Sequence, residues 1–123
     1  MFWKAIPVAV LAACLAACGD EQGGAGGNEA SSRQWTPQDA ALAEVYNRSC
    51  RSCHTIAATG APLTGDTAAW APRMNKGINV LVDNVVSGYG GMPPFGLCMD
   101  CDADQLEALT RFMADPEAEG VSR

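Results

Sequence analysis

The chain has 123 residues and a formal net charge of −6, from 14 acidic and 8 basic residues with a single histidine. This length accommodates one ordinary domain. The acidic balance argues against nucleic acid as a partner, because nucleic-acid binding requires a basic face.

The N-terminus has the pattern of an export signal. A positive charge at Lys4 precedes the apolar run AIPVAVLAA, and small residues follow. The run is shorter than the ~20 residues that a membrane-spanning helix needs. Residues 1–17 are therefore predicted to be a cleaved signal peptide, with an uncleaved N-terminal anchor as the alternative.

The sequence LAAC occurs twice, ending at Cys14 and at Cys18, and each copy resembles the lipobox of bacterial lipoproteins. The second copy leaves a longer apolar run before it. With Cys18 as the acylated N-terminus, four cysteines remain in two C-x-x-C pairs and no odd thiol is left over. Cys18 is therefore the predicted lipidation site, which predicts a stable membrane anchor.

The segment after Cys18 has few apolar side chains that could form a core. Residues 18–34 are rich in Gly, Ser and acidic residues, which predicts a flexible tether with a span on the order of 20 Å. A domain is predicted over residues 35–115, followed by a C-terminal tail over residues 116–123. Because so short a chain buries little apolar surface, it usually needs a disulfide, a metal or a cofactor.

The domain has helical periodicity from its start. Thr36 and Pro37 predict the cap and first residue of a helix that runs into Cys50. Asp66 predicts the cap of a short helix, which Pro72 limits or follows with a new turn.

Two more helices are predicted in the second half. Apolar residues from Ile78 to Val86 predict a helix that ends at Gly88. Asp102 and Gln105 predict a capping box. The helix after it has an apolar face of Leu106, Leu109, Phe112 and Met113 and ends at Pro116. The stretch GYGGMPPFG is predicted to be irregular, and no segment has a period of two. The predicted fold class is all-α.

The chemistry is predicted at CRSCH, residues 50–54. Two thiols at this spacing can add to the two vinyl groups of a haem, and the histidine after them can bind the iron. The pattern C-x-x-C-H is typical of covalent c-type haem attachment. Cys50, Cys53 and His54 are therefore the predicted attachment site.

Three alternatives compete with haem. A zinc site can use Cys50, Cys53, Cys98 and Cys101, but 44 residues separate the pairs, and thiolates fare badly in an exported protein. A thioredoxin-like redox pair needs a βαβ setting that the pattern lacks. The third alternative is a plain structural disulfide.

A haem iron bound by the only histidine needs a sixth ligand, and methionine is the natural candidate. Met92 lies on an irregular loop, stiffened by the two prolines after it. Met74 and Met113 fit core packing, and Met99 lies inside a tight C-x-x-C loop. Met92 is therefore the predicted ligand, and His/Met ligation is typical of iron that transfers electrons.

The pair Cys98 and Cys101 is predicted to form a disulfide between the Met92 loop and the last helix. Such a small loop contributes roughly 2 kcal/mol in the chain-entropy model. The alternative is a redox-active thiol pair.

The chain resembles class I c-type cytochromes, and within them the cytochrome c5 group. The resemblance rests on VYNRSCRSCH, GAP with GD, AAWAPRMNKG, VVSGYGGMPPFGLCMDC and FM near the end, and it covers about residues 41–114. It implies a fold of about four short helices around one haem c, bound through two thioethers.

The resemblance also implies roles for individual residues. It implies His54 and Met92 as axial ligands and Cys98–Cys101 as a disulfide. By the same likeness, the carbonyl of Pro62 accepts a hydrogen bond from His54. Further implied contacts place Trp70 and Arg73 near a haem propionate, with core packing and a solvated charge as their alternatives. The first and last helices are expected to cross with Tyr46 near Phe112.

One departure concerns docking. The position after MPP is often Lys in the group and here is Phe95, which removes a positive charge near the expected haem edge.

The expected function is a lipid-anchored, periplasm-facing electron carrier that is not an enzyme. Its expected partners are redox complexes such as a quinol-oxidising complex, a terminal oxidase or a periplasmic reductase. The alternatives are a gas sensor or haem enzyme with a displaceable Met92, and a zinc-structured adaptor.

Overall fold

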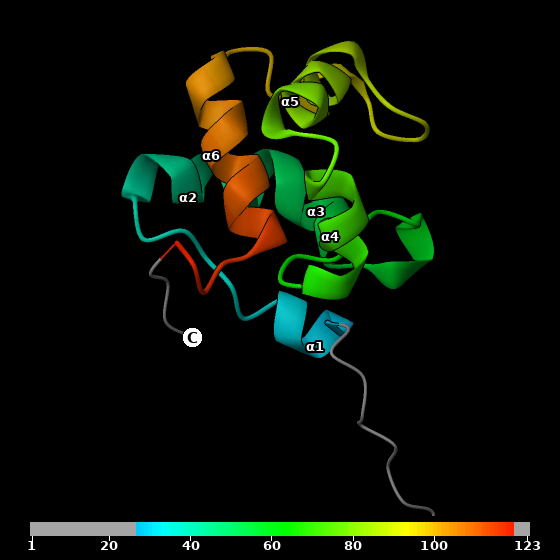
Figure 1. Ribbon diagram of the computed structural model, residues 1–123. Coiled ribbons are helices and arrows are strands. Elements are labelled where there is room, and N and C mark those ends of the chain that lie inside the picture. Colours follow the sequence, from blue (N-terminus) through cyan, green and yellow to red (C-terminus); the bar gives the residue numbers. More distant parts are fainter. Residues whose placement is uncertain (1–26, 120–123) are drawn as a thin grey trace, which may run out of the picture.

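The computed structural model describes residues 27–119, and its regular structure is helical (Figure 1). The α-helices are α1 (Glu29–Ser32), α2 (Ala40–Val45), α3 (Arg51–His54), α4 (Thr67–Met74), α5 (Ile78–Ser87) and α6 (Ala103–Ala114). A π-helical turn, η1 (Tyr46–Cys50), and two 3-10 turns, η2 (Ala57–Thr59) and η3 (Pro94–Leu97), connect them. Within the described residues, the only β pairing is an isolated bridge between Tyr89 and Met92. The predicted all-α class is confirmed.

The first long helix starts later than the sequence predicted. Asp39 is its N-cap, because the Asp39 carboxylate accepts the amide of Leu42 at 2.8 Å. The expected start at Thr36 and Pro37 is therefore wrong, and Pro37 is buried ahead of the helix. From Ala40 the chain stays helical through α2, η1 and α3, which brings the two cysteines of CRSCH onto one helical turn.

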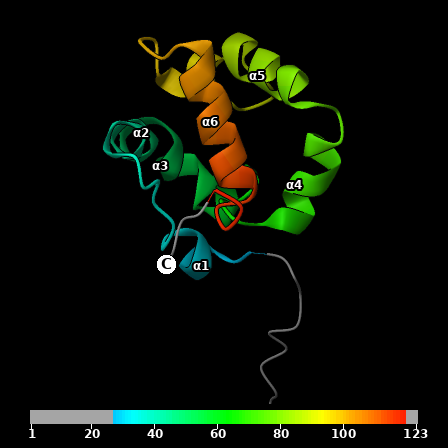
Figure 2. The same ribbon diagram turned by 60° about the vertical axis from the view of Figure 1, so that its left-hand side comes forward.

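Helix α6 packs against α2, α4 and α5, and Figures 1 and 2 show it running through the middle of the molecule. The predicted crossing with the first helix is confirmed, because the rings of Tyr46 and Phe112 meet edge to face at 5.1 Å. The Tyr46 hydroxyl also bonds to the Thr64 hydroxyl at 2.9 Å. Both hydroxyl groups belong to fully buried residues, so this contact joins η1 to the loop before α4 inside the core.

The remaining helix ends agree with the predicted signals, with one exception. Asp66 caps α4, Gly88 ends α5 with a φ of 83°, and the capping box of Asp102 and Gln105 starts α6. Pro72 does not limit α4, which continues to Met74. A proline inside so short a helix removes one backbone hydrogen bond, and its φ suits the helix.

The tether predicted over residues 18–34 is described only from residue 27. In that part, α1 forms and packs on the domain, with Ser32 fully buried. Residues 1–26, which include the predicted signal peptide and Cys18, and residues 120–123 lie outside the described range. Between residues 27 and 119, no helix is both long and apolar enough to span a bilayer.

Candidate functional site

A cavity of about 530 Å³ lies between α3, α4, α5, α6 and the Met92 loop. This volume is within the range of cofactor pockets, ~300–1,000 Å³. Most of its wall is apolar, with Leu81, Val85 and Met113 among the contributors. Six of the predicted site residues line it: Cys53, His54, Pro62, Trp70, Arg73 and Met92. The chain therefore brings segments that are far apart in sequence to one pocket.

The two thiols of CRSCH are free in the structure. Cys53 is exposed and lies on the cavity wall, whereas Cys50 is half-buried and packs against the core beside it. Burial raises the pKa of Cys50 to about 11, although Arg48 opposes this shift. The Cys50 group is therefore a neutral thiol at neutral pH. The structural disulfide considered for this pair is not formed.

His54 is buried at the end of α3 and held by a single carbonyl. Its Nδ1 lies 2.7 Å from the carbonyl oxygen of Pro62. Because a carbonyl only accepts, Nδ1 carries the proton and Nε2 keeps its lone pair. Burial lowers the pKa of His54, and the charge of Arg73 adds to this, against the opposing effect of the Pro62 bond. The imidazole is therefore a neutral group, in the form that binds metals.

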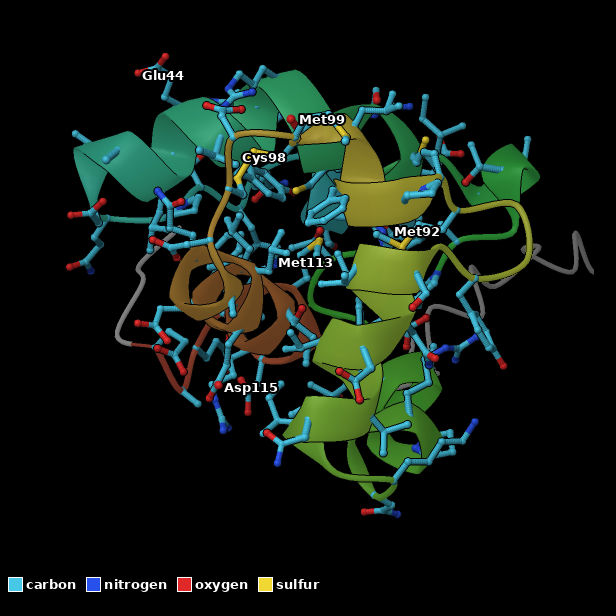
Figure 3. The ribbon with its side chains drawn as sticks, turned by 90° about the horizontal axis from the view of Figure 1, so that it is seen from above. Glu44, Met92, Cys98, Met99, Met113 and Asp115 are labelled. Atoms are coloured by element: carbon cyan, nitrogen blue, oxygen red, sulfur yellow. A yellow bond between two sulfur atoms is a disulfide. The ribbon has the colours of Figure 1, made fainter. Side chains whose placement is uncertain are left out.

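Met92 lies on a tight turn after α5. The amide of Tyr89 donates to the carbonyl of Met92 at 3.0 Å, and the amide of Met92 donates back at 2.9 Å. The half-buried Met92 side chain lines the cavity. Figure 3 labels it on this turn, with Met113 reaching inward from α6. Met99 is 72% exposed on the outside.

The donor set of this cavity suits a flat apolar group held by covalent bonds and two axial ligands. It offers one neutral imidazole, thioether sulfurs and two thiols beside an apolar pocket. A zinc site of four cysteines needs both pairs together, but no group of three or more His, Cys, Asp or Glu residues gathers in the described part of the chain. The residues present fit a haem.

Comparison with known proteins decides the family. The family model described as cytochrome c oxidase, cbb3-type, subunit III matches residues 37–113. The chain is 36% identical over 73 residues to a cytochrome c5 from Ectopseudomonas mendocina, across 58% of this chain and 84% of the relative. It is 39% identical over 73 residues to a cytochrome c5 from Azotobacter vinelandii, across 58% and 88%. A cytochrome c-555 from Chlorobaculum thiosulfatiphilum is 50% identical over 54 residues, 43% of this chain and 63% of the relative.

The chain belongs to the class I c-type cytochromes, in the cytochrome c5 family. The cytochrome carries one covalently attached haem c, as its family does, and acts as a one-electron carrier. The cavity between α3 and the Met92 turn is where its residues fit that group.

Trp70 supports His54 in this cytochrome. Its ring stacks on the imidazole with centroids 5.8 Å apart, and its indole N–H donates to the carbonyl of Leu63 at 2.9 Å. The resemblance placed Trp70 and Arg73 near a propionate. In the structure both line the cavity, with the Trp70 N–H bonded to Leu63 and the Arg73 guanidinium bonded to the carbonyl of Ala69.

Several wall residues were not anticipated from the sequence. Lys76 lines the cavity from the turn just after α4, three residues beyond Arg73. Met113 was assigned to the core, and it is buried, but it also lines the cavity. The periodicity of α6 could not separate a core position from a cavity position, because both are apolar.

A disulfide joins Cys98 and Cys101 after the Met92 loop. Inside this small loop, the Asp100 carboxylate accepts two bonds from the Arg48 guanidinium, at 2.8 and 3.0 Å. Arg48 belongs to η1, which leads directly into α3. The pair therefore links η1 to the disulfide loop, a contact that the sequence did not indicate.

Proposed function

We propose that this cytochrome is an exported, lipid-anchored carrier whose haem is attached through Cys50 and Cys53 and ligated by His54 and Met92. The observation that carries the proposal is that Cys53, His54 and Met92 line the same cavity, with the imidazole fixed by Pro62. Bound haem iron supplies reversible one-electron transfer, and His/Met ligation favours a high reduction potential.

The residues around the cavity hold the two proposed iron ligands, His54 and Met92, in defined positions. The Pro62 carbonyl orients the His54 ring and raises its basicity as a ligand. Trp70 stacks against the same ring. The two hydrogen bonds between Tyr89 and Met92 would hold Met92, the other proposed ligand, on an ordered turn. Because little has to move, electron transfer needs little reorganisation of the site.

The proposed setting is the periplasmic side of a bacterial membrane. The export signal over residues 1–17 and the lipobox ending at Cys18 support it. The oxidising compartment also suits the Cys98–Cys101 disulfide. The proposed partners are redox complexes such as a quinol-oxidising complex, a periplasmic reductase or a terminal oxidase.

The proposed ligation is tested by the absorption spectrum of the oxidised protein. The long-wavelength charge-transfer band of a methionine–iron bond is expected in the native protein and is expected to disappear in Met92→Leu, with a lower reduction potential. Met113→Leu is the matched control, because Met113 lines the same cavity from α6, and it should keep the band.

Two results would overturn the proposed ligation. If Met113→Leu loses the band and Met92→Leu keeps it, the ligand assignment is wrong. If the native protein lacks the band and binds carbon monoxide readily at neutral pH, the sixth position is open and a gas-binding role replaces electron transfer.

A further inference from the structure

Residues 27–35 form a strap on the domain surface, although the sequence predicted most of them to be tether. Asn28 caps α1, since its side chain accepts the amide of Ser31 at 2.9 Å. Ser32 is fully buried and Trp35 is 4% exposed. The strap is therefore anchored at its centre and at its end by buried side chains.

The strap is hydrogen-bonded to the proposed haem-attachment turn and to a residue just past it. The Arg51 guanidinium, which lies between the two haem-binding cysteines in sequence, donates to the carbonyls of Arg33 and Trp35. Glu29 accepts the amide of Ala57, just past the turn, at 2.7 Å. Hydrogen bonds to charged groups contribute more than neutral ones. The contacts join three separate segments and make the strap part of the domain.

The first described residue of the strap lies against the start of α4. A Cβ added to Gly27 would come within 3.1 Å of the Cα of Asp66, the residue that caps α4. The backbone therefore approaches α4 closely at this point. The described part of the chain therefore begins beside the first turn of α4.

Because the strap is bound to the domain from Gly27 onward, a shorter part of the chain connects the domain to the predicted lipid at Cys18. From Cys18 to Gly27 there are nine residue steps, which can span at most about 30 Å. If the chain left the domain at Trp35, the limit would be about 60 Å. With the strap bound to the domain, the connection has about half the reach that it would have from Trp35. A shorter connection restricts the orientation of the domain more strongly.

The strap and the Met92 turn lie at opposite ends of the molecule. In Figures 1 and 2, which differ by a turn about the vertical axis, α1 is at the bottom, and α5 with the segment that follows it is at the top. Tyr89 and Leu97, which line the cavity at the Met92 end, are 59% and 69% exposed.

We propose that the strap holds the α1 end toward the lipid bilayer and directs the Met92 end away from it. This inference rests on the proposed lipid anchor at Cys18. The surface near the bilayer is the one that surrounds α1 and the start of α4.

The orientation can be measured with spin labels on vesicles that contain a nickel-chelating lipid. A label is attached to Ala68→Cys, in the first turn of α4, or to Tyr89→Cys, at the Met92 end; both native residues are exposed. The haem is kept reduced, so that the iron is diamagnetic. Nickel is expected to relax the Ala68 label several-fold more strongly than the Tyr89 label.

Two forms of the protein separate the inference from the lipid proposal. One is the lipidated chain, and the other starts at Gly19 with a polyhistidine tag that binds the nickel lipid. If the lipidated chain fails to float with vesicles, the anchor at Cys18 is wrong, and the tagged chain still decides the orientation. Equal or reversed relaxation of the two labels in the tagged chain would overturn the inference.

A lengthened connection provides the matched control. A Gly/Ser insertion between Gly26 and Gly27 that doubles the connection should bring the two relaxation effects closer together. Glu29→Gln with Arg51→Gln should do the same, because the strap loses its charged contacts. If the difference between the labels persists in both variants, the strap does not set the orientation.

Discussion

Two residues between Met92 and the disulfide have backbone angles that usually belong to glycine. Phe95 has a φ of 59° and Leu97 a φ of 67°, a left-handed conformation that costs roughly 1–2 kcal/mol for a residue with a Cβ. Leu97 is 69% exposed, so packing offsets little of this cost. Hydrogen bonds across the turn and the disulfide that follows it hold the conformation.

This strain gives a prediction for Leu97. Leu97→Gly should be more stable than Leu97→Ala by about 1 kcal/mol, because both remove the apolar side chain and only glycine removes the Cβ. Urea unfolding of the oxidised protein measures the difference. Equal stability of the two variants would mean that the left-handed turn carries no strain at Leu97.

At the level of residues, the sequence predicted the chemistry better than the supporting contacts. CRSCH predicts the attachment site because its spacing is local and specific, and this assignment stays a prediction. The stacking of Trp70 on His54 and the bond from Trp70 to Leu63 depend on where α4 packs. No periodicity within a short helix contains that information.

At the level of elements, one buried polar pair joins η1 to the loop before α4, beside the crossing with α6. Tyr46→Phe keeps the ring contact with Phe112 and removes the hydroxyl that bonds to Thr64. Thr64 is fully buried, and its hydroxyl group loses this hydrogen-bond partner in the variant. The loss should lower the free energy of unfolding by about 1–2 kcal/mol.

A double variant tests the cause of this loss. Tyr46→Phe with Thr64→Val replaces both hydroxyl groups and should recover part of the stability lost in Tyr46→Phe alone. Thermal unfolding of the native protein, the two single variants and the double variant gives the comparison. A double variant that is no more stable than Tyr46→Phe alone would contradict the unsatisfied-hydroxyl explanation.

The ion pair between η1 and the disulfide loop gives a pH-dependent contact. The hydrogen bonds from Arg48 hold the pKa of Asp100 below its ordinary value. Since the pKa is lower in the folded state, the pair stabilises the fold above the unfolded pKa, and this contribution is lost as the pH falls through the folded pKa. Because Asp100 is exposed, the effect on stability is small.

The pKa itself is the better measurement. An NMR titration of the Asp100 carboxyl should show its pKa rise toward the ordinary value in Arg48→Gln. Arg111→Gln is the control, since Arg111 pairs with Glu107 on α6 and not with Asp100. An Asp100 pKa that is the same in Arg48→Gln and the native protein would show that the contact is absent in solution.

The helix boundaries show what local signals can and cannot predict. The capping box at Asp102 and the stop at Gly88 agree with the structure because these signals act within one turn. The start at Thr36 was wrong because two cap candidates lie three residues apart, and Asp39 is the one that binds the helix amides. The π-helical turn at η1 leaves no simple sequence pattern.

For the whole molecule, the strap was the largest feature that composition could not predict. Residues 27–34 have the polar and small residues of a tether, and their order comes from bonds to Arg51 and Ala57, far along the chain. Composition shows how much apolar surface a segment can bury by itself. It does not show which hydrogen bonds a segment distant in sequence will form with it.

The cavity also links the whole fold to its cofactor. The pocket of about 530 Å³ is lined mostly by apolar side chains, among them Leu81, Val85 and Met113. Without a group that covers them, these side chains would face water, which opposes folding. The helices around the cavity therefore depend on haem to complete their core, and a chain that cannot acquire it should not keep this packing.

This dependence can be tested by preventing attachment. Cys50→Ala with Cys53→Ala removes both thioether positions, and the resulting haem-free chain should lose most of its helical circular dichroism and its cooperative thermal transition. Cys98→Ala with Cys101→Ala is the control: it also removes two cysteines, but it keeps the attachment site and should retain haem, helix content and a cooperative transition at lower temperature. A haem-free chain with native helix content and a sharp transition would show that the protein core is sufficient without the cofactor.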